Sequence, residues 1–162
     1  MIPAMILQQT QYLLTTLRDK QLFIDRINEA ESTYKETVQE IRAAVRVVDY
    51  GSDRIESNGK PDEKNIQMML RLEQLEKKHH ELVGPLWDEV DRINKLSGFI
   101  EVMTGDEGEA LRMFYPREKN KAPAKKREIA EALYTDRDCV NELIRSGERK
   151  CAMFLMKEKL LF

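Results

Sequence analysis

Apolar residues recur along the first two thirds of the chain at alternating steps of four and three, the heptad-like spacing of a packed α-helix. The first row comprises Leu13, Leu17, Lys20, Ile24, Ile27, Glu31, Tyr34, Val38, Ile41, Val45 and Val48. The second comprises Met68, Leu72, Leu75, His79, Leu82, Leu86, Glu89, Ile93, Leu96, Ile100 and Met103. Each row has two polar interruptions and is otherwise apolar, which predicts two long helices.

Residues 49–63 separate the two rows and contain two glycines, a proline and no sustained periodicity. This composition favours a loop. Helices of about 35 residues would each be about 50 Å long. Joined by one loop, they should fold back as a long antiparallel helical hairpin that resembles a coiled coil. We assign residues 1–104 to this hairpin.

Further large apolar residues lie outside the two rows. They are Leu14, Leu22, Leu70, Trp87, Val90 and Phe99. A lone pair of helices buries one stripe from each helix and little else, so these residues need another partner. We therefore expect the hairpin to form a homo-oligomer.

Shorter helical patterns follow the hairpin. Thr104 and Asp106 each precede a glutamate by three residues, the capping-box pattern that begins a helix. Pro116 should end that helix. Pro123 suits the first turn of a next helix over residues 124–133.

Two of these patterns, "EIAEAL" and "RDCVNEL", meet at a tight junction of Tyr134, Thr135 and Asp136. Asp136 is placed to cap the second helix. The apolar positions that would face inward are Ile129, Ala130, Leu133, Val140 and Leu143. This is the layout of a helix-turn-helix. We predict an all-α protein in which residues 105–162 form a small C-terminal helix-turn-helix domain that binds DNA.

Positive charge is concentrated just before this motif, although the formal net charge of the chain is only -2. Seven basic residues lie between positions 112 and 127, against the single acid Glu118. Basic side chains supply phosphate affinity, and we expect the phosphate-facing residues to be Arg117, Lys119, Lys121, Lys125, Lys126 and Arg127. The residues of the second helix that would face DNA bases are Arg137, Asp138, Asn141 and Arg145.

Three segments, "SDRIESNGKPDE", "EALRMFY" and "REIAEALYTDRDCVNEL", carry a resemblance to a known family. The chain resembles the phage-encoded late transcriptional regulators of the ArpU/RinA type, found in prophages of Gram-positive bacteria. The second and third segments are similar to that family's "LLELRY" and "EEIAEELGYSERTVRRL". The resemblance implies a sigma factor region 4-like helix-turn-helix, binding to double-stranded promoter DNA, and contacts with host RNA polymerase.

Three positions depart from the pattern of that family. Tyr134 stands in place of the turn glycine, so we expect its backbone to avoid a strongly positive φ. Asp138 and Glu142 stand where polar or basic residues are common. Near DNA, each carboxylate needs a cytosine amino group or a neighbouring arginine, Arg137 or Arg145, as its partner.

Catalytic and metal-binding patterns are absent from the sequence. It has no glycine-rich phosphate loop and no nucleophile, base and acid constellation, and Cys139 and Cys151 lack metal-ligand spacing. We expect no enzymatic activity, cofactor or metal. No apolar run is long enough to cross a bilayer, which favours a cytoplasmic protein.

An alternative function remains open at the sequence level. The charged second helix of the motif also suits a helical structural or adaptor protein of phage assembly or regulation. Such a protein would resemble a small terminase subunit or a module that binds another regulator.

Overall fold

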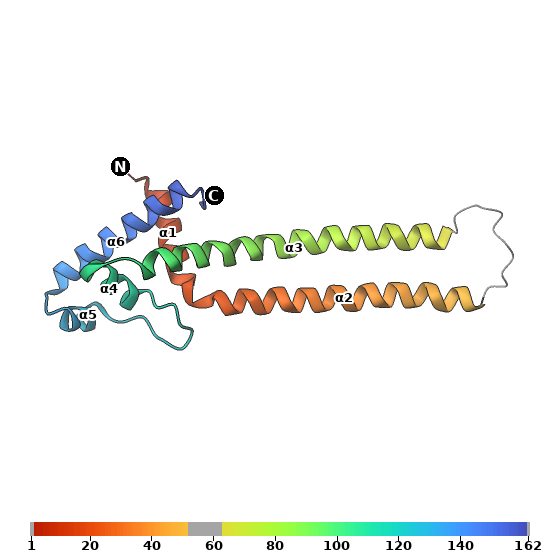
Figure 1. Ribbon diagram of the computed structural model, residues 1–162, viewed down its shortest axis with the longest axis horizontal. Coiled ribbons are helices and arrows are strands. Elements are labelled where there is room, and N and C mark those ends of the chain that lie inside the picture. Colours follow the sequence, from red (N-terminus) through yellow and green to blue (C-terminus); the bar gives the residue numbers. More distant parts are fainter. Residues whose placement is uncertain (1, 52–62, 162) are drawn as a thin grey trace. The chain divides into compact units, whose positions relative to one another are not determined.

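The computed structural model describes residues 2–51 and 63–161, with only the backbone described for residues 45–51. In these ranges the protein is all-α, as predicted, and contains no strand (Figure 1). The helices are α1 (Ala4–Thr16), the short 3-10 helix η1 (Leu17–Asp19), α2 (Lys20–Gly51), α3 (Glu63–Glu101), α4 (Gly105–Phe114), α5 (Lys126–Ala132) and α6 (Arg137–Lys157).

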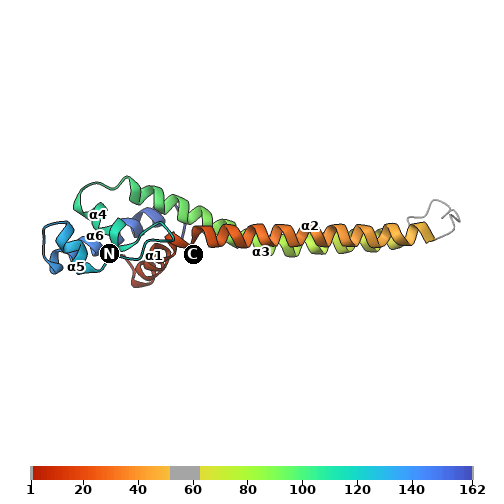
Figure 2. The same cartoon turned by 90° about the horizontal axis from the view of Figure 1, so that it is seen from below.

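Residues 24–87 form one of two compact units. In this unit α2 and α3 run antiparallel, which confirms the predicted hairpin (Figures 1 and 2). One polar interruption of each row lies beside one of the other row, because His79 Nε2 lies 3.7 Å from Glu31 Oε1. The His79 ring also stacks on Tyr34, with 4.4 Å between ring centroids. Most of the predicted loop falls in residues 52–62, outside the described residues.

The predicted register of α3 is wrong around position 82. Leu82 is 58% exposed, whereas Val83 is 5% exposed. One heptad later Val90 is buried, and Glu89 forms an ion pair with Arg92 at 2.8 Å. The buried face of α3 therefore includes Val83 and Val90. This register is favoured because it buries apolar side chains and leaves the carboxylate of Glu89 paired with Arg92.

The long first helix is interrupted, contrary to the sequence prediction. Between α1 and α2 the chain tightens into η1. Just before η1, the hydroxyl groups of Thr15 and Thr16 donate hydrogen bonds to the carbonyl oxygens of Tyr12 (2.7 Å) and Leu13 (2.8 Å). Threonine hydroxyls that bond to carbonyls of the preceding turn weaken and bend helices, which accounts for the break.

The second compact unit comprises Met1–Phe23 and Asp88–Phe162. Its core combines α1, the end of α3 and the three C-terminal helices. The core includes Leu14, Leu17, Leu96, Ile100, Leu111, Ile129, Val140 and Leu155. This division differs from the boundary we expected at residues 104 and 105, because α1 packs along α6 and Phe99 of α3 stacks on Phe154 of α6.

Three of the six apolar residues assigned to an oligomer interface are covered within the chain. Leu14 and Val90 are buried, and the Phe99 ring lies 4.4 Å from that of Phe154. Leu22, Leu70 and Trp87 remain 43%, 52% and 51% exposed. The structure therefore corrects half of the predicted interface, and the oligomer itself stays a prediction.

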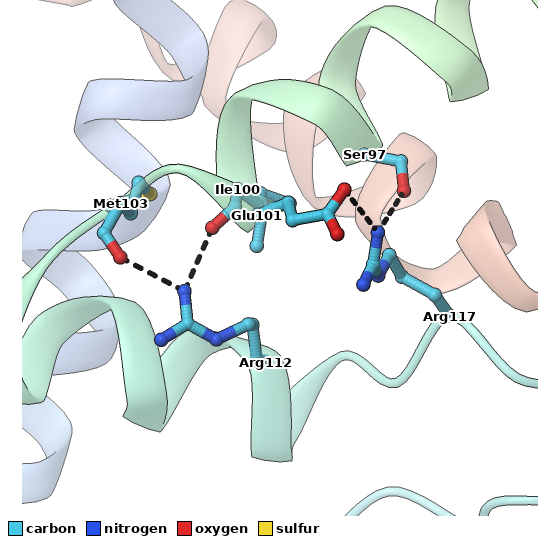
Figure 3. A network of polar contacts seen from close by, with 6 residues as sticks. All are labelled: Ser97, Ile100, Glu101, Met103, Arg112 and Arg117. Atoms are coloured by element: carbon cyan, nitrogen blue, oxygen red, sulfur yellow. Dashed lines mark hydrogen bonds and ion pairs between the residues drawn. The ribbon is translucent and has the colours of Figure 1, made fainter.

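Two arginine side chains form hydrogen bonds with groups at the C-terminal end of α3 (Figure 3). Arg112 Nη1 donates hydrogen bonds to the carbonyl oxygens of Ile100 and Met103, both at 2.9 Å. These carbonyls belong to the last turn of a helix and the residues after it, where partners from the helix are missing. A Cβ atom at Gly108 would lie 2.5 Å from the Met103 carbonyl oxygen, so the same corner requires glycine.

Candidate nucleic-acid interface

Helix α4 begins without the predicted capping box. Thr104 is the N-cap residue, but its side chain forms no capping hydrogen bond. The carboxylate of Glu107, which would complete the box, is engaged with α6 instead. It lies 3.0 Å from Lys150 Nζ and accepts a hydrogen bond of 3.1 Å from Ser146 Oγ. Glu107 therefore joins α4 to α6.

Helix α5 begins later than predicted. Its first residue is Lys126 and its N-cap is Lys125, so Pro123 precedes the first turn. The backbone N–H of Ala124 donates to the carbonyl of Met113 in α4 at 3.0 Å. This bond holds the chain in a non-helical conformation against α4 until Lys125.

The turn after α5 has the hydrogen bonds of a Schellman motif, a common helix ending. The N–H of Thr135 donates to Ala130 O at 3.0 Å, and the N–H of Tyr134 donates to Glu131 O at 3.4 Å. Tyr134 has φ 54°, in the left-handed region. Our expectation that this backbone avoids positive φ is therefore wrong: the tyrosine occupies the position that usually holds glycine.

Replacing Tyr134 with glycine should stabilise the protein. The Tyr134 side chain is 98% exposed and buries no apolar surface, while its backbone is strained because it lies in the left-handed region. We expect Tyr134→Gly to raise the free energy of unfolding by about 0.5–1 kcal/mol.

Thermal unfolding followed by circular dichroism measures this gain. Tyr12→Gly is the matched control, because Tyr12 is also exposed (63%) but lies inside α1, where glycine should destabilise. A Tyr134→Gly protein that melts below the wild type would contradict the strain argument.

Asp136 caps α6, as predicted. Its carboxylate accepts a hydrogen bond of 2.7 Å from the backbone N–H of Cys139. Helix α6 therefore begins at Arg137. The Schellman motif ends α5 and the Asp136 cap begins α6, so hydrogen bonds define both sides of the turn between the two helices.

The predicted inner face of this helix pair is confirmed. Ile129, Ala130 and Val140 are buried, and Leu133 and Leu143 pack partly buried against the same core. Helices α4, α5 and α6 all contact one another. At the α4–α6 crossing a Cβ atom at Gly147 would lie 3.1 Å from a methyl group of Leu111, so a small residue allows the close approach.

A buried carboxylate connects three helical segments beneath this surface. Glu148 of α6 accepts hydrogen bonds from the Tyr115 hydroxyl at 2.6 Å and from Gln11 Nε2 at 3.0 Å. Burial, the hydrogen bond to Glu148 and its charge raise the pKa of Tyr115. Burial and the same carboxylate raise the pKa of Cys151 to about 12, so this buried thiol stays protonated.

The residues expected to face DNA bases lie on the first three turns of α6 and differ in exposure. Arg137, Asp138 and Arg145 are exposed. Asn141 is partly buried, and its Oδ1 atom is buried with no hydrogen-bond partner in the described part of the chain. Its amide is therefore only partly available to a partner.

The two acidic residues of α6 that depart from the family pattern face solvent. Asp138 and Glu142 are exposed, and neither forms an ion pair with an arginine among the described residues. The pairing with Arg137 or Arg145 that we considered from the sequence is therefore not formed.

The residues expected to face phosphates differ in whether their side chains already have a partner within the protein. Arg117 donates to Glu101 Oε2 (3.1 Å) and Ser97 Oγ (3.3 Å), as Figure 3 shows. Lys121 lies 3.7 Å from Glu118, Arg127 lies 3.8 Å from Glu131, and Lys126 lies above the Phe114 ring. In the described part of the chain, Lys119 and Lys125 are exposed and without a partner.

The sequence reasoning overlooked a further exposed cation, Arg149, on the same face of α6 as Arg145. Arg149 lies one turn beyond Arg145 and is exposed. Its spacing of four residues from Arg145 is the signal that places both on one face.

Among the described residues, no group of three histidine, cysteine, aspartate or glutamate side chains is placed to bind a metal ion. No helix in the described ranges is long and apolar enough to span a bilayer. Comparison of the chain with protein-family models, curated proteins and solved structures finds no match.

Proposed function

We propose that the protein is a phage or prophage transcriptional regulator of the ArpU/RinA type. It binds promoter DNA through a sigma region 4-like helix-turn-helix made of α5 and α6, and it acts in the cytoplasm of the bacterial host together with host RNA polymerase. The observation that carries the proposal is the α5–α6 geometry: a Schellman ending and the Asp136 cap separate two helices that share one core with α4. This is the three-helix setting in which a second helix enters the major groove.

Electrostatics also favours DNA over a neutral partner. Lys119, Lys125, Arg137 and Arg145 are exposed, and no described residue neutralises them. Unpaired cations beside a candidate reading helix suit a polyanion, because phosphate neutralisation releases counterions.

The hairpin is proposed to hold two or more copies together and so to set the spacing of half-sites. A groove of about 600 Å³ between α2 and α3 is lined in part by Tyr34, Leu75 and Leu86, and the exposed Leu82 lies at it. A second copy would cover these apolar side chains. Light scattering that gives the mass of a single chain at micromolar concentration would contradict this part of the proposal.

The adaptor function is supported by a different observation. Asp138 and Glu142 are exposed and unpaired among the described residues, and carboxylates at these positions repel phosphate. A helical adaptor or a small terminase-like subunit would present the same surface of α6 to a protein.

Selection of bound fragments from random genomic DNA separates the two functions. A regulator should enrich fragments with a shared sequence, and the wild-type protein should bind DNA most tightly at low salt. Absence of DNA binding at low salt, together with recovery of one phage or host protein by pull-down, would establish the adaptor.

A further inference from the structure

The outward face of α6 continues past the residues assigned to base contacts. Positions 142, 145 and 149 follow one another at steps of three and four, so they share one side of the helix. All three are exposed, while Ile144, Gly147 and Cys151 on the opposite side are buried. Arg149 therefore belongs to the same surface as Arg145.

Folding does not explain this pair of arginines. Like charges four residues apart on a helix destabilise it by a few tenths of a kcal/mol. Neither guanidinium group has a partner in the described part of the chain. By contrast, the neighbouring Lys150 is paired with Glu107 at 3.0 Å, and Lys157 lies in the last turn, where a cation offsets the helix dipole.

If residues 137–145 of α6 occupy a major groove, the length of the helix puts Arg149 near the border of that groove. The helix has 21 residues, which corresponds to about 30 Å, whereas the major groove is about 12 Å wide. From Arg137 to Arg145 the helix advances about 12 Å. Arg149 lies about 6 Å farther along, where a helix that fills the groove meets the sugar-phosphate strand.

We propose that Arg149 is a phosphate-binding residue: its guanidinium group holds a backbone phosphate at the edge of the major groove that residues 137–145 enter. This inference rests on the proposed function and extends its binding surface toward the C-terminal half of α6. A planar guanidinium with several donors suits a phosphate in two-point contact. An acidic protein segment would be the competing occupant of the same arginine.

The test measures affinity against salt with a labelled duplex of random sequence. Arg149→Ala should bind about threefold to tenfold more weakly at low salt, and the slope of log K against log salt should fall by about 0.9. Arg149→Lys should keep most of the slope. Lys157→Ala is the matched control, since it removes the same charge from the same helix and should leave the slope unchanged.

Each outcome decides the inference. DNA binding by the wild type with an unchanged slope in Arg149→Ala overturns the inference and leaves the proposed function standing. A changed preference for one sequence, without a changed slope, overturns the phosphate assignment. Loss of binding to polyglutamate with DNA binding intact assigns Arg149 to an acidic protein. No DNA binding by the wild type at low salt overturns both proposals.

Discussion

Replacing Lys125, Lys126 and Arg127 with alanine is expected to weaken binding to every duplex sequence by roughly one hundredfold at low salt. The three residues precede or begin α5, the first helix of the proposed motif, where phosphate contacts fall. Each lost phosphate contact should lower the salt slope by about 0.9, so the triple variant should lose a slope of about 2.7. Preference among sequences should change little.

The contribution of each residue to this loss of DNA affinity depends on its partners within the protein. Lys125 has none in the described part of the chain, and it should contribute most. Lys126 lies 5.8 Å from the centre of the Phe114 ring, and Arg127 lies 3.8 Å from Glu131 with its side chain 88% exposed. Exposed pairs of the latter kind are weak, so Arg127 remains available to phosphate.

The matched control is the triple alanine variant of Lys35, Arg71 and Lys77. It removes two lysines and one arginine from exposed positions of the hairpin, and so changes the net charge equally. Titrations by fluorescence anisotropy should show the control close to the wild type. An equal loss in both triple variants would attribute the effect to net charge and contradict a phosphate site before α5.

Residue periodicity was sufficient for the features that depend on local sequence. The spacing of Ile129, Ala130 and Val140 determines which side of a helix is apolar, and all three are buried. Asp136 acts within one turn of its own position, and its cap is present. Features of this range need no knowledge of distant parts of the chain.

The wrong predictions depend on contacts between distant segments. The apolar row at Leu82 continued equally well through Val83, and only packing selects one of the two. Similarly, Leu14 and Phe99 were assigned to a second copy because the sequence did not reveal that α6 packs against α1 and against Phe99 of α3. Glu107 had a local partner in the capping-box pattern, but it pairs with Lys150, 43 residues away in the sequence.

The buried network around Glu148 shows the same limitation. Gln11, Tyr115 and Glu148 are far apart in the sequence, and the Gln11–Glu148 bond spans 137 residues. Periodicity places Glu148 beside the inner face of α6 but does not identify its donors. The network joins α1 and the end of α4 to the helix proposed to read DNA, so it couples the stability of the unit to the position of α6.

Tyr115→Phe should lower the free energy of unfolding by about 2 kcal/mol, because the hydroxyl donates to a carboxylate that has little access to water. The hydrogen bond is 2.6 Å long, and Glu148 is 6% exposed. Without the hydroxyl, Gln11 remains the one described side-chain donor to this carboxylate. Thermal unfolding should shift down by about 4–8 °C.

Two variants separate this hydrogen bond from other effects of the substitution. Tyr12→Phe makes the same change at an exposed tyrosine of α1 and should stay within about 0.5 kcal/mol of the wild type. Glu148→Gln should cost less in the Tyr115→Phe background than alone, because it removes a charge that has lost a donor. Additive effects of the two substitutions would contradict a direct interaction.

Alkaline pH gives an independent readout of the same bond. Because the pKa of Tyr115 is raised in the folded protein, the phenol of the unfolded chain loses its proton first. The contribution of the Tyr115 phenol to the free energy of unfolding is complete below about pH 10. Above that pH it declines by about 1.4 kcal/mol per pH unit. Wild-type stability should therefore fall more steeply above this pH than that of Tyr115→Phe, while Cys151 contributes equally to both. Parallel stability curves for the two proteins would show that the phenol proton is not held by Glu148.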